Sequence, residues 1–238
     1  MRALLGVTIP TLQTPLIRQL KDAPRPLFVV SLNPEILLKA RKDFAYKAII
    51  NSADIKFVDG VGIAIMAWLL YGIKLARTPG ADVAQELIAA ATDRKRVLLV
   101  GGSAPANKKA ARAMGIQGFG GDFLWKEAME RIIAQKPDIL FVSLGAPKQE
   151  QFIHRLFTTY PQNNLPRIAM GVGGVIDFWA SPSLRAPKLM RQTGLEWLWR
   201  LIRHPLRLII IVYAVIVFPL ACLWVWFNVK LKYVSLSP

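Results

Sequence analysis

Cysteine and histidine are scarce in this chain. Cys222 is the single cysteine, so no disulfide can form within the chain, which argues against a disulfide-stapled secreted scaffold and suits a reducing compartment. His154 and His204 stand far apart in the sequence, and there is no Asp-X-Asp triplet. Clusters of ligands at metal-binding spacing are therefore lacking, and we expect neither a metal site nor a cofactor.

Acidic residues are also few. The chain has 15 of them against 31 lysines and arginines, a net charge of +16, which favours anionic partners such as nucleic acid, phospholipid headgroups or diphosphates. Hydrophobic residues make up 53% and the mean hydropathy is +0.35, so we expect some segment to meet lipid. The start of the chain makes a poor signal peptide, because its apolar run is short and is broken by Thr8 and Pro10, and no cleavage site follows.

Short apolar runs alternate with segments of helical periodicity. We expect strands at 27–31, 55–59, 96–100, near 116, at 138–144 and at 167–170. Helices are expected at 34–48, 61–70, 82–93, 104–114 and 126–135. This alternation predicts an α/β domain over 1–184, a mostly parallel sheet sandwiched by helices in the Rossmann-like manner.

Ligands of such sheets bind beyond the carboxyl ends of the strands. The expected strands end at Asp59, Gly101-Gly102, Gly145 and Gly171-Val172-Gly173-Gly174. Glycine lets backbone approach a phosphate or a nucleobase closely, although it serves tight turns equally well. We therefore take Gly101, Gly102, Gly171, Gly173 and Gly174 as candidate substrate-binding positions.

The composition changes after 184. A basic appendage at 185–207 carries Arg200, Arg203 and Arg207 among interleaved tryptophans. A hydrophobic segment and tail follow at 208–238, in which 208–227 has no charged residue and is long enough for one membrane-crossing helix. We expect Pro219 to kink or split that helix, which leaves a single span, a hairpin and a buried helix as alternatives.

Several short motifs occur in a fixed order. They are Ser31-Leu32-Asn33-Pro34-Glu35, Val58-Asp59-Gly60-Val61-Gly62, Arg77-Thr78-Pro79-Gly80-Ala81-Asp82, Gly145-Ala146-Pro147-Lys148-Gln149-Glu150, Arg185-Ala186-Pro187 and Gly194-Leu195-Glu196-Trp197-Leu198-Trp199-Arg200. In this order the chain resembles the WecG/TagA/CpsF family of glycosyltransferases. The resemblance implies an inverting enzyme that moves N-acetylmannosamine, or a related sugar, from a UDP-sugar to a polyprenyl-diphosphate-linked sugar. Bacterial surface polysaccharide or teichoic acid would be the product.

The resemblance also implies roles for residues at the strand ends. Asp59 falls where the family has its proposed general base, although Asp-Gly alone would equally make a turn. Gln149 falls on a functional glutamine of the family, and Lys148 precedes it. Ser31 and Asn33 could hold the sugar or the acceptor, and Asn33 also suits a helix N-cap. Asp177 could accept hydrogen bonds from the ribose.

The leaving UDP needs its charge neutralised. Without metal ligands, cationic side chains and helix N-termini must do this, and we favour Arg77, Arg200, Arg203 and Arg207. The last three match arginines of the family's appendage, and a basic surface facing solvent or lipid headgroups is an equal alternative. The excess of cations before 208 over Lys230 and Lys232 after it puts the catalytic domain at the cytoplasmic face of the inner membrane, anchored through 208–227.

Two other functions compete with this prediction. A nucleotide-dependent oxidoreductase should show Gly-X-Gly-X-X-Gly after a strand, and Gly171-Val172-Gly173 lacks the third glycine. A membrane-tethered nucleic-acid-binding module suits the charge, but no helix-turn-helix, zinc-finger or RNP-like pattern occurs, so we expect no nucleic acid partner. The expected partners are a UDP-sugar, a polyprenyl-diphosphate-linked acceptor and membrane lipid, and the sequence leaves a homo-oligomer open.

Overall fold

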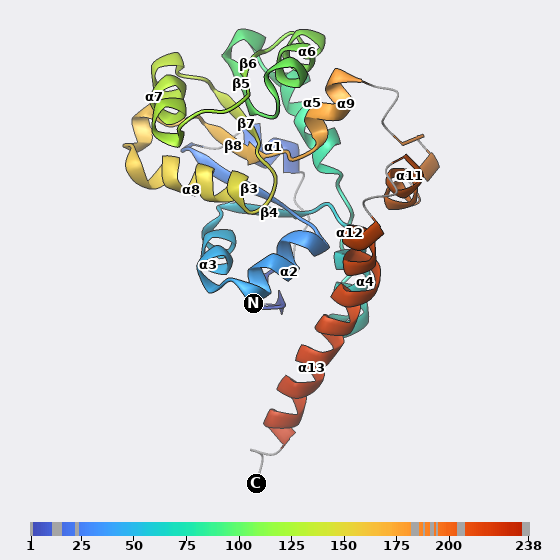
Figure 1. Cartoon of the computed structure of the whole chain (residues 1–238). Coiled ribbons are helices and arrows are strands. Elements are labelled where there is room, and N and C mark those ends of the chain that lie inside the picture. Colours follow the sequence, from blue (N-terminus) through green and yellow to red (C-terminus); the bar gives the residue numbers. More distant parts are fainter. Residues whose placement is uncertain are drawn as a thin grey trace.

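A six-stranded parallel sheet forms the centre of the protein (Figure 1). The structure is a computed structural model that describes residues 2–10, 16–21, 24–181, 186–187, 189–190, 193, 195–203 and 208–234. The strands run in the order β4 (Ile55–Val58), β3 (Leu27–Leu32), β8 (Ile168–Gly171), β7 (Ile139–Ser143), β5 (Val97–Gly101) and β6 (Gln117–Phe119). A separate small hairpin consists of β1 (Ala3–Leu4) and β2 (Val7–Thr8).

Helices cover both faces of the sheet, which confirms the predicted fold class. One face carries α2 (Pro34–Lys42), α3 (Phe44–Ser52), α4 (Val61–Tyr71), α7 (Trp125–Gln135) and α8 (Lys148–Thr159). The other carries α1 (Leu16–Lys21), α5 (Gly80–Ala90), α6 (Ala104–Met114) and α9 (Val175–Ala180). Single turns of 3₁₀ helix lie at η1 (Arg94–Arg96) and η2 (Gln162–Asn164).

Strand β3 shows why the sheet strands read as unbroken apolar runs. All six of its residues are buried, because side chains alternate between two covered faces. Phe28 and Val30 pack into the core under α2, α3 and α8, whereas Leu27 and Val29 pack into the core under α1 and α5.

The chain reverses its direction across the sheet beside β3. Strand β4 lies on one side of β3. The other four strands lie on its opposite side, where β8 and β7 stand between β3 and the earlier strands β5 and β6. A crevice at the carboxyl ends of the strands is expected at such a reversal, between β3 and β8.

The segment expected as one helix from 34 to 48 is two helices. Asp43 ends α2 with its N–H bonded to the carbonyl of Lys39, and its side chain then accepts from the N–H of Tyr46 at 3.0 Å to begin α3. The apolar spacing continues across the break because both helices pack on the same core. The prediction was wrong because it followed that spacing and overlooked aspartate as a cap.

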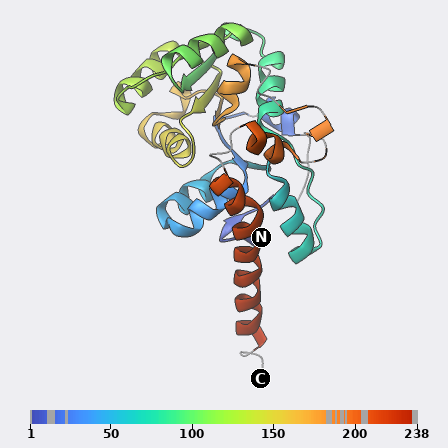
Figure 2. The same ribbon diagram turned by 45° about the vertical axis from the view of Figure 1, so that its right-hand side comes forward.

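The C-terminal helix, as we name residues 208–234, is continuous (Figure 2). It comprises α12 (Leu208–Val212), a π-helical segment η5 (Tyr213–Val217) and α13 (Phe218–Val234). The helix is not split at Pro219. The π-helical segment lies just before this proline, and the N–H of Phe218 donates to the carbonyl of Tyr213. The structure therefore has no hairpin turn there.

The C-terminal helix begins as part of the domain and then extends away from it (Figure 1). Phe218, Ala221 and Cys222 are buried in the same core as α2 and α4. Within the part of the chain that is described, Leu208–Asn228 is the helix long and apolar enough to cross a membrane. The basic appendage contributes α11 (Glu196–Arg203), which precedes α12.

Candidate active site

Asp59 lies at the carboxyl edge of the sheet, directly after β4. The carbonyl of Leu32 accepts hydrogen bonds from the N–H groups of Asp59 at 2.9 Å and Gly60 at 3.1 Å, which ties this turn to the end of β3. A β-carbon placed on Gly80 would lie 3.4 Å from Oδ2 of Asp59 and 3.5 Å from the β-carbon of Ser31. Gly80, at the start of α5, is buried and therefore packs close to the Asp59 carboxylate and Ser31.

Arg77 is held against Asp59. Its Nε donates to the backbone carbonyl of Asp59 at 2.7 Å, and the N–H of Thr78 donates to the carbonyl of Val58 at 2.7 Å. The segment that follows α4 thus returns along the end of β4 and brings a guanidinium to the candidate base. The structure thereby unites Ser31, Asp59 and Arg77 on the α5 face of the sheet.

Asn33 caps the helix that begins next to this group. Its Oδ1 accepts from the N–H of Ile36 at 3.0 Å, which is the N-cap role expected from the sequence. A β-carbon on Gly60 would lie 3.2 Å from the α-carbon of Asn33 and 2.5 Å from the ring of Pro34. The Asp59-Gly60 turn therefore packs directly on the start of α2.

Gln149 forms the second group at the same edge, on the α8 face. It is buried, with 4% of its surface exposed. Its Oε1 accepts from the N–H of Gly173 at 2.9 Å, and its Nε2 donates to Oε1 of Glu150 at 2.6 Å. A β-carbon on Gly171 would lie 2.6 Å from that Nε2, so Gln149 packs flat on the end of β8. In this structure Gln149 supports the β8 loop, and its contact with a sugar stays a prediction.

Ser143 holds the same loop from the other side. Its Oγ donates to the carbonyl of Gly173 at 2.6 Å, so both polar groups of the Gly173 residue are fixed. Gly173 has a φ of +50°, a left-handed conformation that favours glycine. The loop after β8 is therefore shaped before any ligand binds, which is what a rigid nucleotide or sugar site requires.

A buried carboxylate lies behind Gln149. Glu150 is 2% exposed, and its second oxygen accepts from the hydroxyl of Tyr46 at 2.9 Å. Burial raises the pKa of Glu150, and the hydrogen bonds from Gln149 and Tyr46 oppose that rise. Burial, together with the charge of Glu150, raises the pKa of Tyr46. Glu150 thereby connects α3 to the Gly173 loop through Gln149.

Lys39 fastens the loop between β7 and α8. Its Nζ donates to the carbonyl of Ala146 at 2.6 Å and to Glu35 at 2.7 Å. This places the start of α8 next to α2. Pro147, expected in the first turn of α8, is the residue before it, and Lys148 is the first helical residue, with an exposed side chain.

Gly101 and Gly102, at the end of β5, serve close packing within the protein. A β-carbon on Gly101 would meet the carbonyl of Ser143 at 2.6 Å, and one on Gly102 would meet Ile176 at 2.6 Å. Gly174 precedes α9, and Asp177 in its first turn is exposed. The structure brings these residues to the predicted edge, and their contact with a nucleotide stays a prediction.

The arginines of the appendage are only partly described. Arg200 and Arg203 belong to α11, and Arg207 lies outside the described residues. Their predicted place at the diphosphate stays a prediction. In the described part of the chain, no group of three or more His, Cys, Asp or Glu side chains could hold a metal ion.

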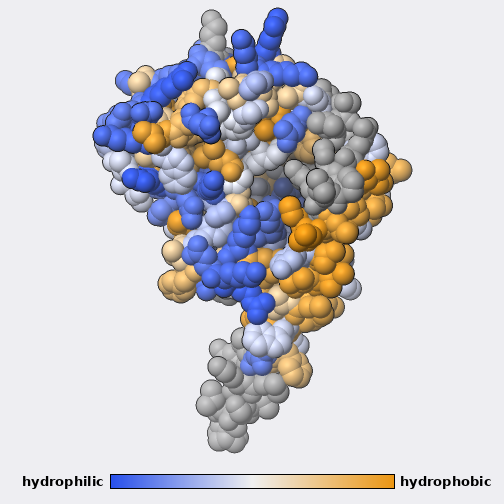
Figure 3. Space-filling model, viewed as in Figure 1, coloured by the Kyte–Doolittle hydropathy of each residue, from blue (hydrophilic) through white to orange (hydrophobic). Residues whose placement is uncertain are grey.

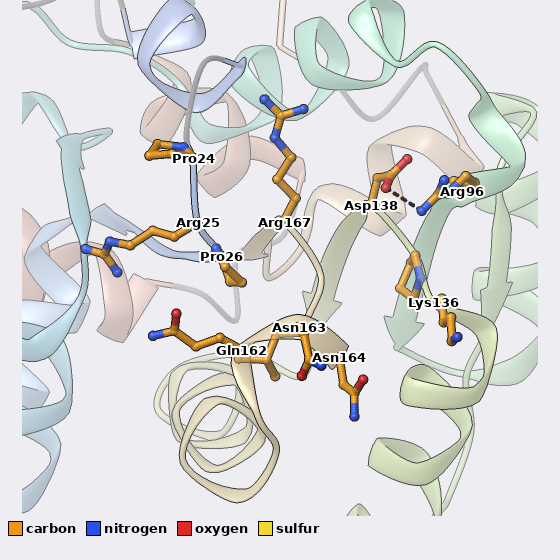
Figure 4. Close-up of a pocket in the computed structure, with 12 residues that line it drawn as sticks. Pro24, Arg25, Pro26, Arg96, Lys136, Asp138, Gln162, Asn163, Asn164 and Arg167 are labelled. Atoms are coloured by element: carbon orange, nitrogen blue, oxygen red, sulfur yellow. Dashed lines mark ion pairs between the residues drawn. The ribbon is translucent and has the colours of Figure 1, made fainter.

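A hollow in the described surface lies at the opposite edge (Figure 4). This cavity of about 360 Å³ is lined by residues that precede strands, among them Arg25, Arg96 and Arg167. Two of the cations are paired, Arg25 with Asp54 and Arg96 with Asp138, each at 2.7 Å. Arg25 and Arg167 point away from each other in Figure 4. Cations that diverge and are already paired do not make an anion site, so the candidate site stays at the carboxyl edge.

Comparison with known proteins decides the family. The sequence model of the glycosyl transferase WecG/TagA/CpsF family matches residues 3–232. The chain belongs to this family.

Two curated relatives show what members of the family do. An N-acetylglucosaminyldiphosphoundecaprenol N-acetyl-beta-D-mannosaminyltransferase of Bacillus spizizenii is 31% identical over 196 residues, which cover 78% of this chain and 75% of the relative. The protein of the same name from Bacillus subtilis is 31% identical over 189 residues, which cover 75% and 72%. The chain is accordingly a glycosyltransferase of the WecG/TagA/CpsF family, and the family's association with lipid-linked substrates implies that it works at a membrane.

Sequence reasoning did not assign four residues that build this site. Ser143, Glu150, Tyr46 and Lys39 support the loops from beneath. Glu150 could have been assigned from the sequence, because it completes the Pro147-Lys148-Gln149-Glu150 motif. Tyr46 had no local signal, since its partner lies 104 residues away in the chain.

Proposed function

We propose that this glycosyltransferase moves an N-acetylmannosaminyl residue, or a related hexosyl residue, from UDP to a polyprenyl-diphosphate-linked sugar with inversion. The observation that carries the proposal is the Asp59 carboxylate at the strand edge, close to Ser31 and Gly80, on a peptide whose carbonyl accepts a hydrogen bond from Arg77. The names of the two relatives supply the acceptor, an undecaprenyl diphosphate that bears N-acetylglucosamine.

Asp59 acts as the general base in this proposal. The acceptor hydroxyl attacks the anomeric carbon from the face opposite UDP, and its proton passes to the Asp59 carboxylate as the new bond forms. The bond to the diphosphate oxygen breaks in the same step, so the configuration at the anomeric carbon inverts. Ser31 lies near Asp59 and would hold a hydroxyl of the sugar or the acceptor.

Cations stabilise the UDP that leaves. Arg77 approaches from the β4 side and Lys148 from the start of α8, and Arg200, Arg203 and Arg207 come from the appendage. Guanidinium forks match phosphate oxygens, so these side chains can take the place of a metal ion. The rigid Gly173 loop and the glycines at the end of β5 would hold the nucleotide.

The C-terminal helix attaches the enzyme to the cytoplasmic face of the membrane. UDP-sugars are made in the cytoplasm, and the excess of cations on the domain side of the apolar segment favours this orientation. The product would enter a bacterial surface polysaccharide or teichoic acid.

A product assay tests the proposal. Membranes that contain the protein are incubated with a panel of UDP-sugars and polyprenyl-diphosphate-linked acceptors, with and without EDTA, and the lipid products are analysed by mass spectrometry. We expect one added N-acetylhexosamine on the acceptor in both conditions. No product with any UDP-sugar would refute the proposal, and loss with EDTA that Mg²⁺ reverses would refute the arginine-based stabilisation.

A further inference from the structure

Helix α4 exposes an apolar stripe. Ile65, Trp68 and Leu69 recur at the spacing of one helical face and are 53%, 56% and 55% exposed. The helix has no charged residue, and its opposite face, with Ile63, Met66 and Ala67, is buried in the core. Large side chains on one face of an otherwise well-packed helix mark a surface for another apolar partner.

The stripe continues onto the C-terminal helix. A β-carbon on Gly62 would lie 3.6 Å from the ring of Phe218, so the two helices touch at the start of α4. Most of the large apolar side chains that the described residues expose belong to these two helices, including Ile209, Ile216, Leu220 and Phe227. Figure 3 shows the result as one continuous orange area over α4, α12 and the upper part of α13.

Cations border this apolar surface and limit how deeply it can insert into a bilayer. Lys42 lies over the ring of Tyr213 at 5.6 Å, and Arg41 lies over the ring of Trp224 at 5.3 Å. Both come from the end of α2, which packs along the C-terminal helix. Figure 3 shows hydrophilic side chains directly beside the orange area. Paired cations and aromatic rings of this kind suit the headgroup region of a bilayer.

A perpendicular span would bury those cations. Tyr213 and Trp224 are about 16 Å apart along the helix, so an upright 208–228 segment would carry Arg41 and Lys42 into the hydrocarbon, which is about 30 Å thick. A charge in the hydrocarbon is costly. The docked position of the helix therefore favours an oblique or in-plane placement, with the cations at headgroup level.

We propose that α4 and the C-terminal helix form one apolar surface that inserts into the acyl chains of a single leaflet without crossing the bilayer. Helix α4 contacts the C-terminal helix at Gly62, so an oblique or in-plane placement of that helix brings the exposed face of α4 to the same leaflet. Asp59 is two residues before α4, so insertion sets the candidate base at headgroup level. The inference deepens the membrane attachment proposed above and does not depend on which sugar is transferred.

Labels at matched positions test the insertion. In full-length protein with Cys222→Ala, single cysteines are introduced as Leu69→Cys on α4, Leu220→Cys on α13 or Leu124→Cys before α7, and each is labelled with an environment-sensitive fluorophore. Leu124 is the control, because it is an exposed leucine, at 68%, that caps α7, and Figure 1 shows α7 far from the outer end of the C-terminal helix. The proteins are reconstituted with phosphatidylcholine and phosphatidylglycerol vesicles that carry a quencher within the acyl chains.

The expected result is quenching at 69 and 220 and none at 124. A protease-cleavable tag after Pro238 should also be reached from the same side as the label at 124. Quenching at 220 alone would overturn the role of α4, and a tag reached only from the other side would overturn the single-leaflet placement. Absence of quenching at both positions would refute the proposal and the membrane attachment together, while the product assay still tests the transfer reaction.

A second copy of the chain is the competing occupant of α4. Protection of the label at 69 without lipid, in a manner that increases with protein concentration, would show that another subunit covers the stripe and would overturn the proposal.

Discussion

The guanidinium of Arg77 is bonded to the backbone of Asp59, with Nε donating to the carbonyl at 2.7 Å. In the sequence, helix α4 and the segment that follows it, the sixteen residues from 61 to 76, lie between these two contacting residues. Arg77 therefore closes the loop that contains α4 and fixes the peptide that carries the candidate base.

Arg77→Lys should lower kcat. Lysine keeps the charge but cannot reproduce the directed Nε–H bond, so the Asp59 segment loses its fixed position. We expect a loss of about 10- to 100-fold, since a misplacement of about 1 Å can cost 10²-fold in rate. The measurement is single-turnover transfer with saturating donor. Arg112→Lys, on the exposed side of α6, is the matched control, and equal rates for both variants would contradict the role of Arg77.

Tyr46→Phe should destabilise the protein. It leaves one oxygen of the buried Glu150 without its hydrogen bond, which costs about 1–3 kcal/mol of unfolding free energy. Chemical denaturation in mild detergent measures the difference. Tyr160→Phe, at a partly buried tyrosine packed on the same core, is the control. Equal stability of wild type and Tyr46→Phe would show that the bond contributes nothing.

Glu150 should make stability depend on pH. Its pKa in the folded protein is raised above the ordinary value of 4.5, so folding favours the protonated form. The stabilisation is complete below that ordinary value and is lost as the pH rises through the raised pKa. Wild type should therefore lose stability relative to Glu150→Gln as the pH increases above about 4.5. Thermal unfolding from pH 4 to pH 9 measures this, and parallel curves for the two proteins would contradict it.

The sheet and the edge that carries the site could be predicted from the sequence. Buried parallel strands appear as short apolar runs, and β3 and β7 were placed within one or two residues for this reason. Asp59 and Ser31 come together because they lie at the carboxyl ends of the neighbouring strands β4 and β3, which the pattern of strands predicts. Arg77 reaches Asp59 from the segment between α4 and α5, which that pattern does not predict.

What lies beneath the loops could not be predicted. The bond from Tyr46 to Glu150 depends on how α3 packs against α8, which is a tertiary relationship with no local pattern. The π-helical segment before Pro219 could not be predicted either. A proline inside a helix is unfavourable, but that free-energy penalty does not specify how the backbone adjusts to it.

Phe218→Ala should loosen the C-terminal helix. The ring of Phe218 is fully buried and packs near Gly62, so its removal leaves a cavity that costs about 3–5 kcal/mol. Cys222, one turn away and 2% exposed, is a native reporter. N-ethylmaleimide should modify it faster in the variant than in wild type. Leu220→Ala, on the exposed face of the same helix, should leave the rate unchanged. Equal modification rates in all three proteins would mean that Phe218 does not hold the helix in place.

The general base is the centre of this account, and Asp59→Asn is its most direct test. Asparagine keeps the shape of the side chain and removes the proton acceptor, so kcat for transfer should fall by about 10²–10⁴-fold. Calorimetry should find UDP binding within a few-fold of wild type, and Asp122→Asn, at an exposed loop position, should transfer at the wild-type rate. An Asp59→Asn enzyme that turns over within a few-fold of wild type would contradict the account.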